Sequence, residues 1–470
     1  MDWLIVGSVI FFVAAMLLVG IIVSKKVNDA DDFFAGGRKT PEFLIVATLL
    51  ASEVGGGVMI GSVGYGYSLG WGALWYLAPM AIGLVLFGLI MGARLKKEGD
   101  EKGYLSMFEW LSGRFGDKND IRLIGGIVML TGFIGSLASQ FKAMGTSLST
   151  IAHIDPVWGL LIGAIIIIII YASLGGLMSV MWTDLLQAAV FIFGMVVFLP
   201  MLCARPEVGG LANLLAYAGS NYPGVMSVST ADWRLGMICT MTVAPFVRQY
   251  YYQRMFASKS PKVARNSMLW QALFLVVVAI WTVLVGVGVN MLNNALENPE
   301  GAMPWALAEV MPRVIAAVVL GAITACIMST ADTFVNAAAL TFVRDIYGII
   351  NKINGKVISK EKELKVARLS SFVIGCLALV IALFAASVMT VIQKAWAILG
   401  GGLFCPMVVS YFWKKSSHRG VVLSMVLGFT ATLLCTLFAS FNAIFVGLPV
   451  GLVALIIGSI AMPDEKPAVA

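Results

Sequence analysis

Charged residues are scarce in this sequence. Only 12% of its 470 residues are Asp, Glu, Lys or Arg, whereas 60% are hydrophobic, and the mean hydropathy is +0.92. Soluble proteins average about 25% charged residues, so this chain has too little charge to cover a surface that faces water. The composition excludes a cytosolic enzyme, a secreted disulfide scaffold and a disordered chain, and it predicts an integral membrane protein.

Residues that bind metals or carry nucleophilic catalysis are equally sparse. The chain has two histidines, His153 and His418, and its six cysteines are scattered singly with no CxxC pair. Zinc sites and disulfide frameworks need clustered cysteines or histidines. We therefore expect no metal centre of that kind, no disulfide framework and no enzyme activity.

Long hydrophilic loops are also missing, since no loop is much longer than about 30 residues. The apolar runs between the loops are long enough to cross ~30 Å of hydrocarbon at about 1.5 Å per residue. The first run has no basic segment before it and no small-residue cleavage site, so we interpret it as a retained helix. Thirteen transmembrane helices are predicted, at residues 4–23, 43–65, 74–93, 122–150, 157–176, 181–202, 232–253, 266–290, 314–346, 367–386, 389–412, 419–438 and 441–461.

The net charge of +7 comes from basic residues that lie in alternate connections. These connections hold four, seven, five, seven, three and one basic residues, or 27 of the 32 Lys and Arg. Basic residues concentrate on the cytoplasmic side of a membrane. The pattern predicts a multi-pass protein of the cell membrane with its N-terminus outside and its C-terminus in the cytoplasm. The charge therefore indicates topology, and we expect the lipid bilayer as partner and no nucleic acid.

Two predicted spans contain helix-breaking residues. Residues 55–57 are three glycines directly after Val54, and Pro245 lies inside the seventh span. Five-helix units at 43–202 and 203–412 would place both breaks in the same helix of each unit, and an odd helix number makes the second unit inverted. Matched breaks in inverted repeats mark the midplane binding site of a transporter. Alternatively, glycine and proline are simply common in transmembrane helices, often at close contacts.

The two units leave 1–42 as a peripheral N-terminal helix and loop, and 413–470 as two peripheral C-terminal helices. The predicted fold class is therefore an all-α membrane protein with a five-plus-five inverted-repeat core. Its first and sixth core helices are broken.

Ionisable residues within spans are costly and are functional by default. Glu53 stands beside the first break, Asp332 lies in the ninth span, and Asp184 and Arg248 lie nearer the cytoplasmic ends. From the sequence, Glu53 could be a cation ligand, a proton acceptor, a partner for an amine, or one half of a buried pair with Arg248.

The ninth span also carries hydroxyl groups next to its aspartate. Ser329, Thr330, Asp332 and Thr333 lie within about 1.3 turns of one helix. Oxygen ligands suit hard cations, although Ser and Thr often bond back to their own helix. The embedded Asp332 favours a cation site.

These motifs resemble those of the sodium:solute symporter family, which has the LeuT-type inverted-repeat fold. Residues 171–187 read YASLGGLMSVMWTDLLQ, similar to the family's GGL, WTD and Q signature. Gln253-Arg254 resembles its cytoplasmic motif, and Met328–Thr333 resembles its cation-site helix. The resemblance implies secondary active transport, in which Na⁺ entry drives uptake of an organic solute.

The resemblance also implies ligands. Position by position, the main Na⁺ site would use the carbonyls of Ala51, Val54 and Cys326 with the side chains of Ser329 and Thr330. Some members of the family have a second Na⁺ site, which here would be Asp184, Asp332 and Thr333.

The solute site is predicted around the two breaks. Glu53 sits where relatives that transport proline carry an aspartate, and the aromatic cage of the choline-transporting branch is missing. A buried acid and a buried base suit an amino acid, a carboxylate or a similar charged or zwitterionic metabolite. The residues predicted to contact it are Glu53, Gly56, Gln140, Pro245, Arg248 and Trp396.

Three functions compete. The first is a sodium-coupled symporter that works by alternating access and binds a small organic solute, with the chain acting as a monomer. The second is a proton-coupled transporter of the same fold, in which Glu53 or Asp332 titrates. The third is a channel or membrane sensor, which the lack of a recurring filter motif disfavours.

Overall fold

The computed structural model describes residues 3–24, 36–152, 154–173, 176–226, 230–439 and 441–464. The regular elements of these residues are helices, joined by loops, with no β-strand among them. Residues 174–175 of the motif at 171–187 lie outside the described residues, as do residues 32–35, where the resemblance to the family begins, and the basic residues Lys25, Lys26 and Lys466.

Helices coincide with all thirteen predicted spans. By length and hydropathy, nine helices of the described chain could cross a membrane, so the number of thirteen crossings stays a prediction. The long helices and half-helices are α1 (Trp3–Ser24), α3 (Glu42–Glu53), α4 (Val63–Leu69), α5 (Leu74–Phe87), α6 (Ala93–Lys102), α8 (Asn119–Ala152), α9 (Pro156–Ser173), α10 (Gly176–Cys203), α12 (Ala231–Val243), α13 (Gln249–Ala257), α14 (Pro261–Leu292), α16 (Arg313–Thr341), α18 (Lys360–Phe384), α19 (Val388–Phe404), α21 (His418–Phe438) and α22 (Ile444–Ala461).

Short helices connect these elements. They are α7 (Met107–Gly113), α11 (Gly210–Ser220), α15 (Ala302–Glu309), α17 (Gly348–Ile353) and α20 (Ser410–Phe412).

The second predicted span is broken, as expected. Helix α3 ends at Glu53, and Val54 has φ −85° and ψ 63°, outside the helical range. The amides of Val58 and Met59 both donate to the Gly55 carbonyl, at 3.0 and 2.8 Å. In a regular helix the Val58 amide would donate to Val54. The carbonyl of Val54 is thereby released from the helical ladder.

The seventh span is broken at its proline. Helix α12 ends at Val243, a 3₁₀ turn covers Ala244–Val247, and α13 begins at Gln249. Arg248 between them is extended, with φ −110° and ψ 117°. Pro245 in this turn lacks the N–H that a continuing helix would need.

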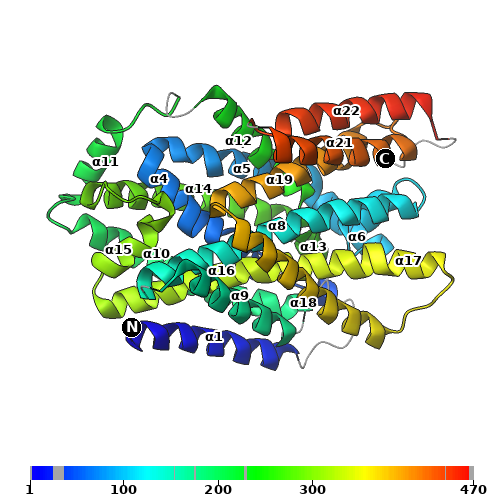
Figure 1. Cartoon of the computed structure of the whole chain (residues 1–470). Helices are drawn as coiled ribbons and strands as arrows, with labels where there is room; N and C mark the ends of the chain where they lie inside the picture. The colour runs from blue at the N-terminus through cyan, green and yellow to red at the C-terminus, as the bar shows by residue number, and fades with distance from the viewer. Residues whose placement is uncertain are drawn as a thin grey trace.

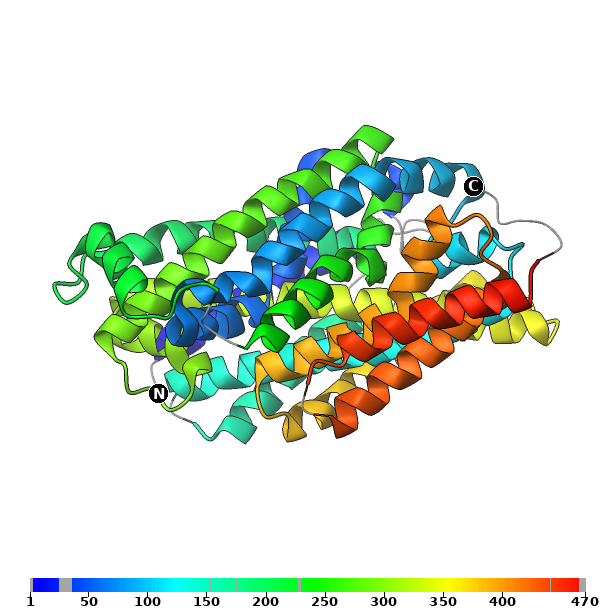
Figure 2. The same ribbon diagram turned by 90° about the horizontal axis from the view of Figure 1, so that it is seen from above.

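The broken helices lie inside the bundle. In Figure 1, α1 runs along one edge, where it packs against α10 and α16, and the pair α21 and α22 lies at the opposite edge against α19. Helix α14 packs against α4 and α5, and Figure 2, seen from above, shows it running beside these blue helices. Most residues of α3, α16 and α19 and all residues of α13 are buried, so neighbouring helices enclose them.

Two backbone hydrogen bonds join the start of half-helix α3 to the end of half-helix α13. The Thr40 amide donates to the Ala257 carbonyl and the Lys259 amide donates to the Thr40 carbonyl, both at 3.0 Å. Helix α3 precedes its break and α13 follows its break. The half-helices that meet are therefore opposite in chain order, as an inverted pair requires.

Candidate functional site

An ion pair joins the two breaks. Arg248 Nη1 lies 2.9 Å from Glu53 Oε1 and 3.2 Å from Oε2, and both side chains are buried. The hydroxyls of Tyr250 and Tyr251 each donate to Glu53 Oε2 at 2.8 Å. Of the roles that the sequence left open for Glu53, the structure shows the buried pair with Arg248.

Two aromatic rings stand beside this pair. The Cζ atom of Arg248 lies 3.7 Å from the centroid of the Trp396 ring, a cation–π contact. The ring of Tyr76 is stacked parallel to that of Trp396, with centroids 6.1 Å apart. In the described structure, Tyr76 Oη and the Nε and Nη2 atoms of Arg248 are buried without a hydrogen-bond partner. The structure therefore places Trp396, a predicted solute contact, against Arg248 at the second break.

The glycines at the first break allow close approach to α8 and α16. The Gly56 amide donates to Gln140 Oε1 at 2.8 Å, and a Cβ on Gly56 would lie 2.2 Å from the Cβ of Ala143. A Cβ on Gly55 would lie 2.3 Å from Thr330 Oγ1. Gly56 is thus required by its close packing against Ala143 of α8, whereas the sequence predicted it as a contact for the solute.

The residues predicted for the main Na⁺ site lie where α3 ends against α16. Thr330 Oγ1 donates to the Ala51 carbonyl at 3.2 Å, and the Val54 carbonyl has left the helical ladder. Cys326 and Ser329 are buried on α16 beside Thr330. Carbonyl and hydroxyl oxygens are the donors that a hard cation takes, so this set fits Na⁺.

The residues predicted for a second Na⁺ site come together only in part. The Asp184 carboxylate accepts hydrogen bonds from Thr48 and Ser329. Thr333 is close to this group, with its Oγ1 2.7 Å from Ser52 Oγ. Asp332 makes no hydrogen bond to Asp184 or Thr333 in the described structure, and its Oδ1 has no partner there.

The centre of that group is filled by Arg254. Its Nη2 donates to Thr333 Oγ1 at 2.8 Å, to Ser52 Oγ at 2.9 Å and to Thr48 Oγ1 at 3.1 Å. The same nitrogen lies 3.8 Å from Asp184 Oδ2. A guanidinium group therefore stands among the oxygens that a second cation would need.

Sequence reasoning missed several of these residues. Arg254 was noted only as part of a motif, and three consecutive tyrosines, residues 250–252, follow Arg248. Such a run of hydroxyl-bearing rings beside an intramembrane arginine is a signal that could have revealed them. Thr48, Ser52 and Tyr76 carry no signal of that kind.

A pocket of about 350 Å³ opens between α12, α19 and the α21–α22 connection, and its lining includes Trp233, Gln393 and Lys394. Gln393 Nε2 donates to Tyr65 Oη at 2.7 Å. The ring of Tyr65 contacts those of Trp233 and Tyr76 edge-on, with centroids 5.6 and 6.1 Å apart. A layer of Tyr65, Trp233 and Gln393 thus separates this pocket from Tyr76.

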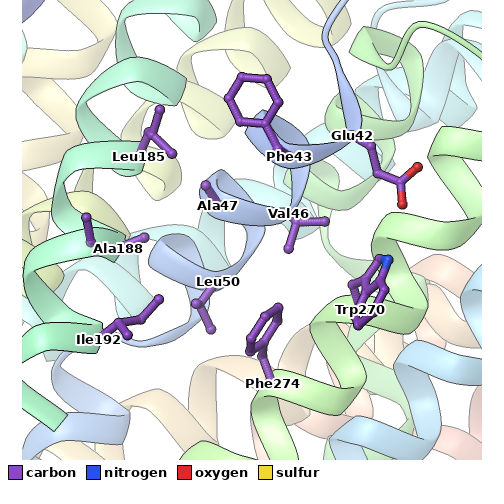
Figure 3. Close-up of a pocket in the computed structure, with 11 residues that line it drawn as sticks. Glu42, Phe43, Val46, Ala47, Leu50, Leu185, Ala188, Ile192, Trp270 and Phe274 are labelled. Atoms are coloured by element: carbon purple, nitrogen blue, oxygen red, sulfur yellow. The ribbon is translucent and has the colours of Figure 1, made fainter. Parts of the chain in front are cut away.

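A second hollow, of about 590 Å³, lies between α3, α10 and α14 (Figure 3). Phe43, Leu50, Ile192 and Phe274 are among its apolar lining residues, and Glu42 contributes a carboxylate. Such a lining suits lipid chains better than a charged solute.

The arrangement is that of a secondary transporter with two discontinuous helices. Its fold is similar to that of a substrate-bound, outward-open Na⁺-coupled sialic acid symporter, with a TM-score of 0.84, 20% identity and full coverage of both chains. It is also similar to a nucleobase-cation-symport-1 family transporter, with a TM-score of 0.60, 12% identity, and 93% and 95% of the two chains covered. These likenesses establish the LeuT-type fold.

The chain belongs to the sodium:solute symporter family, whose model matches residues 33–428. It is therefore a membrane transporter rather than an enzyme, and Na⁺ is its coupling ion. It is 26% identical to high affinity choline transporter 1 of Homo sapiens, over 90% of this chain and 75% of that protein. It is 25% identical to the sodium/sialic acid symporter SiaT of Proteus mirabilis (97% and 94% covered) and 24% identical to the high-affinity proline transporter PutP of Bacillus subtilis (88% of each).

Proposed function

We propose that this protein imports a small charged or zwitterionic organic solute by alternating access, driven by Na⁺. The observation that carries the proposal is the meeting of the two helix breaks at Glu53 and Arg248. Breaks at matching positions place a polar site where transporters of this architecture bind their cargo. Relatives with different solutes, choline, sialic acid and proline, support the transport function and leave the solute open.

The coupling ion is assigned to the main site, with the carbonyls of Ala51, Val54 and Cys326 and the hydroxyls of Ser329 and Thr330 as ligands. Ala51 and Val54 flank Glu53 in the sequence. An ion held by their carbonyls fixes the backbone on both sides of the Glu53–Arg248 pair. Sodium binding and solute binding thereby favour the same conformation, and each raises the affinity for the other.

For the second set, we propose that the Arg254 guanidinium supplies the positive charge among Thr48, Ser52, Asp184 and Thr333. A second Na⁺ then binds there only after Arg254 has moved away. The transport cycle uses one Na⁺ at the main site.

The membrane arrangement is proposed from the sequence. Thirteen spans place the N-terminus outside and the C-terminus in the cytoplasm of a cell-membrane protein that works as a monomer. Cysteine residues placed at Val357 and at Met226, each exposed in a connection between helices, label from the cytoplasm and from outside respectively under this topology. Labelling with membrane-impermeant maleimide of intact and opened cells checks it.

Reconstituted vesicles test the coupling. Solutes are first chosen by their Na⁺-dependent stabilisation of the purified protein, because a ligand stabilises in proportion to RT ln(1 + [L]/Kd). Uptake is then compared under an imposed Na⁺ gradient at constant pH and under a proton gradient without Na⁺. Uptake that needs Na⁺ supports the proposal. Undiminished accumulation with protons alone overturns it and favours titration of Glu53 or Asp332.

A further inference from the structure

We infer that the solute is a small carboxylate, held by the edge of the Arg248 guanidinium that carries Nε and Nη2. This inference rests on the proposed function, and it assigns the solute of that function to one chemical class.

The Arg248 guanidinium has one edge in use and one edge free. Its Nη1 donates to Glu53 and lies 2.8 Å from Tyr250 Oη. Its Nε and Nη2 are buried and have no hydrogen-bond partner in the described chain. Buried donors on a charged group are expensive to leave unpaired. These two nitrogens share one side of the planar group, where two parallel N–H bonds match the two oxygens of a carboxylate.

Glu53 offers no matching place for an amine. Its carboxylate already accepts hydrogen bonds from Arg248 Nη1 at both oxygens and from Tyr250 and Tyr251 at Oε2. Oε1 accepts one of these hydrogen bonds and Oε2 accepts three, so neither oxygen of Glu53 lacks a partner. The acid of the pair is satisfied and the base is not. The pair therefore selects a carboxylate and not an amine.

A further donor and an apolar wall are linked to Arg248 through Trp396, whose ring contacts both the Arg248 guanidinium and the ring of Tyr76. Tyr76 Oη is buried without a hydrogen-bond partner in the described chain, and a Cβ on Gly57 would lie 3.1 Å from it. The stacked rings of Tyr76 and Trp396 can cover the apolar part of a small organic acid. The set suits a compact acid with one charged end.

Charge explains how this solute would couple to Na⁺. Glu53 and Arg248 neutralise each other, so a bound carboxylate adds one uncompensated negative charge inside the protein. A cation at the carbonyls of Ala51 and Val54, which flank Glu53 in the chain, offsets that charge in a medium of low dielectric constant. Each ligand thereby increases the affinity for the other.

In this inference, the solute reaches Arg248 from the pocket whose lining includes Trp233, Gln393 and Lys394. The contacts of Tyr65 with Gln393 and Trp233 must open before a solute reaches Tyr76. The positive charge of Lys394 in the pocket lining favours an anion there, and the negative charge of Asp232 in the same lining weakens this preference.

Thermal unfolding of the purified full-length protein tests the inference with matched probes in NaCl and in KCl. Propionate, lactate, pyruvate, benzoate and nicotinate are compared with propionamide, lactamide, benzamide and nicotinamide, and with propylamine and benzylamine. We expect at least one carboxylate to raise Tm in NaCl only, and its amide to leave Tm unchanged. Equal or greater stabilisation by an amide or amine, or none by any carboxylate, overturns the inference.

Variants at the free edge sharpen the test. Arg248→Lys keeps the positive charge but removes the two parallel N–H donors of the free edge. We therefore expect the Kd of the stabilising carboxylate to rise at least tenfold. Tyr76→Phe, which removes one hydroxyl, should raise it severalfold and remains informative if Arg248→Lys does not fold. Arg313→Lys, at an exposed position of α16, is the matched control. Unchanged affinity in Tyr76→Phe and Arg248→Lys contradicts the assignment.

The outcomes separate this inference from the proposed function. If NaCl alone does not stabilise the wild-type protein relative to KCl, the sodium site itself is wrong. If NaCl stabilises but carboxylates have no advantage over their amides, only the solute class is wrong.

Discussion

Glu53 and Arg248 form a buried ion pair 2.9 Å long although 195 residues separate them in the sequence. Each lies at the break of a different membrane helix, so the pair fixes the relative position of the two discontinuous segments. Buried ion pairs often add little net stability because desolvation of both charges is costly. We interpret this one as a device that positions Arg248 for its ligand.

The first prediction concerns the removal of one partner. Glu53→Gln leaves the Arg248 charge buried without its counter-ion, so the protein should be destabilised by about 3–5 kcal/mol. The double variant Glu53→Gln/Arg248→Met removes both charges and should recover much of the loss in Tm. Thermal unfolding in detergent measures both. A double variant as unstable as the sum of the single variants would show that the pair is not coupled.

The second prediction concerns the main sodium site. Thr330→Ala removes the hydroxyl that contacts the Ala51 carbonyl, so the Na⁺ concentration for half-maximal stabilisation should rise about tenfold, which corresponds to about 1.4 kcal/mol. Thr324→Ala on the same helix is the control, because the Thr324 hydroxyl is buried without a hydrogen-bond partner in the described chain. Titration of Tm with NaCl at constant ionic strength measures the effect. Equal half-saturation in all three proteins contradicts the site.

The third prediction uses the glycines of the first break. Gly56→Leu should abolish transport because even a Cβ at this position would meet the Cβ of Ala143 at 2.2 Å. Gly55→Ala should weaken Na⁺ binding, since its Cβ would meet Thr330 Oγ1 at 2.3 Å. Gly194→Ala on α10 is the control, with its nearest neighbour at an ordinary 3.6 Å. Uptake and Na⁺ titration are the measurements. Wild-type uptake by Gly56→Leu would contradict the conclusion that Gly56 must pack closely against α8.

The fourth prediction concerns Arg254. With this guanidinium among the hydroxyls of Thr48, Ser52 and Thr333, Na⁺ should activate transport with a Hill coefficient of about 1, as one coupled site requires. Arg254→Gln removes the charge that faces Asp184, so stability should fall through the unpaired buried carboxylate. High NaCl should partly restore this stability, because Na⁺ can bind beside Asp184 once the Arg254 guanidinium is absent. A wild-type Hill coefficient near 2 contradicts the proposal that Arg254 takes the place of a second Na⁺.

The fifth prediction concerns the loop helix α7. Glu109 caps α7 together with Ser106, and its Oε1 lies 3.1 Å from Arg122 and 2.9 Å from Arg344. Burial raises the pKa of Glu109, but Arg344 and Arg122 together outweigh it, so the pKa lies below its ordinary value of 4.5. This carboxylate therefore contributes stability that is fully present above pH 4.5 and is lost as the pH falls through the lowered pKa.

The pH dependence of unfolding checks this prediction. The Tm difference between the wild type and Glu109→Gln should be constant from about pH 7 to about pH 5 and should shrink at lower pH. Glu101→Gln serves as control because its carboxylate pairs only at 4.0 Å with Lys97 and is more than half exposed. A Tm difference that does not change with pH would show that the ion pairs of Glu109 contribute nothing.

The sequence predicted the helices more completely than it predicted the candidate site. Hydropathy and helix-breaking residues act locally, so the helical segments and both breaks were predictable, and the helices from α1 to α22 confirm them. The number of membrane crossings stays a prediction. The contact of Thr330 with Ala51 was implied by the family's motif and is present. Asp332 was predicted to join Asp184 and Thr333, and the structure does not show it there.

By itself, the sequence determined that this is a helical membrane protein with two broken helices, because composition and helix-breaking residues act through neighbouring residues alone, and its motifs implied transport through their resemblance to a family. Only the tertiary structure decided that Glu53 pairs with Arg248, that Arg254 stands among the hydroxyls beside Asp184, and that Gly56 is needed for contact with α8. These relationships join segments far apart in the chain, and they depend on the depth and rotation at which packed helices meet. The few charged residues of the sequence acquire their roles through that packing.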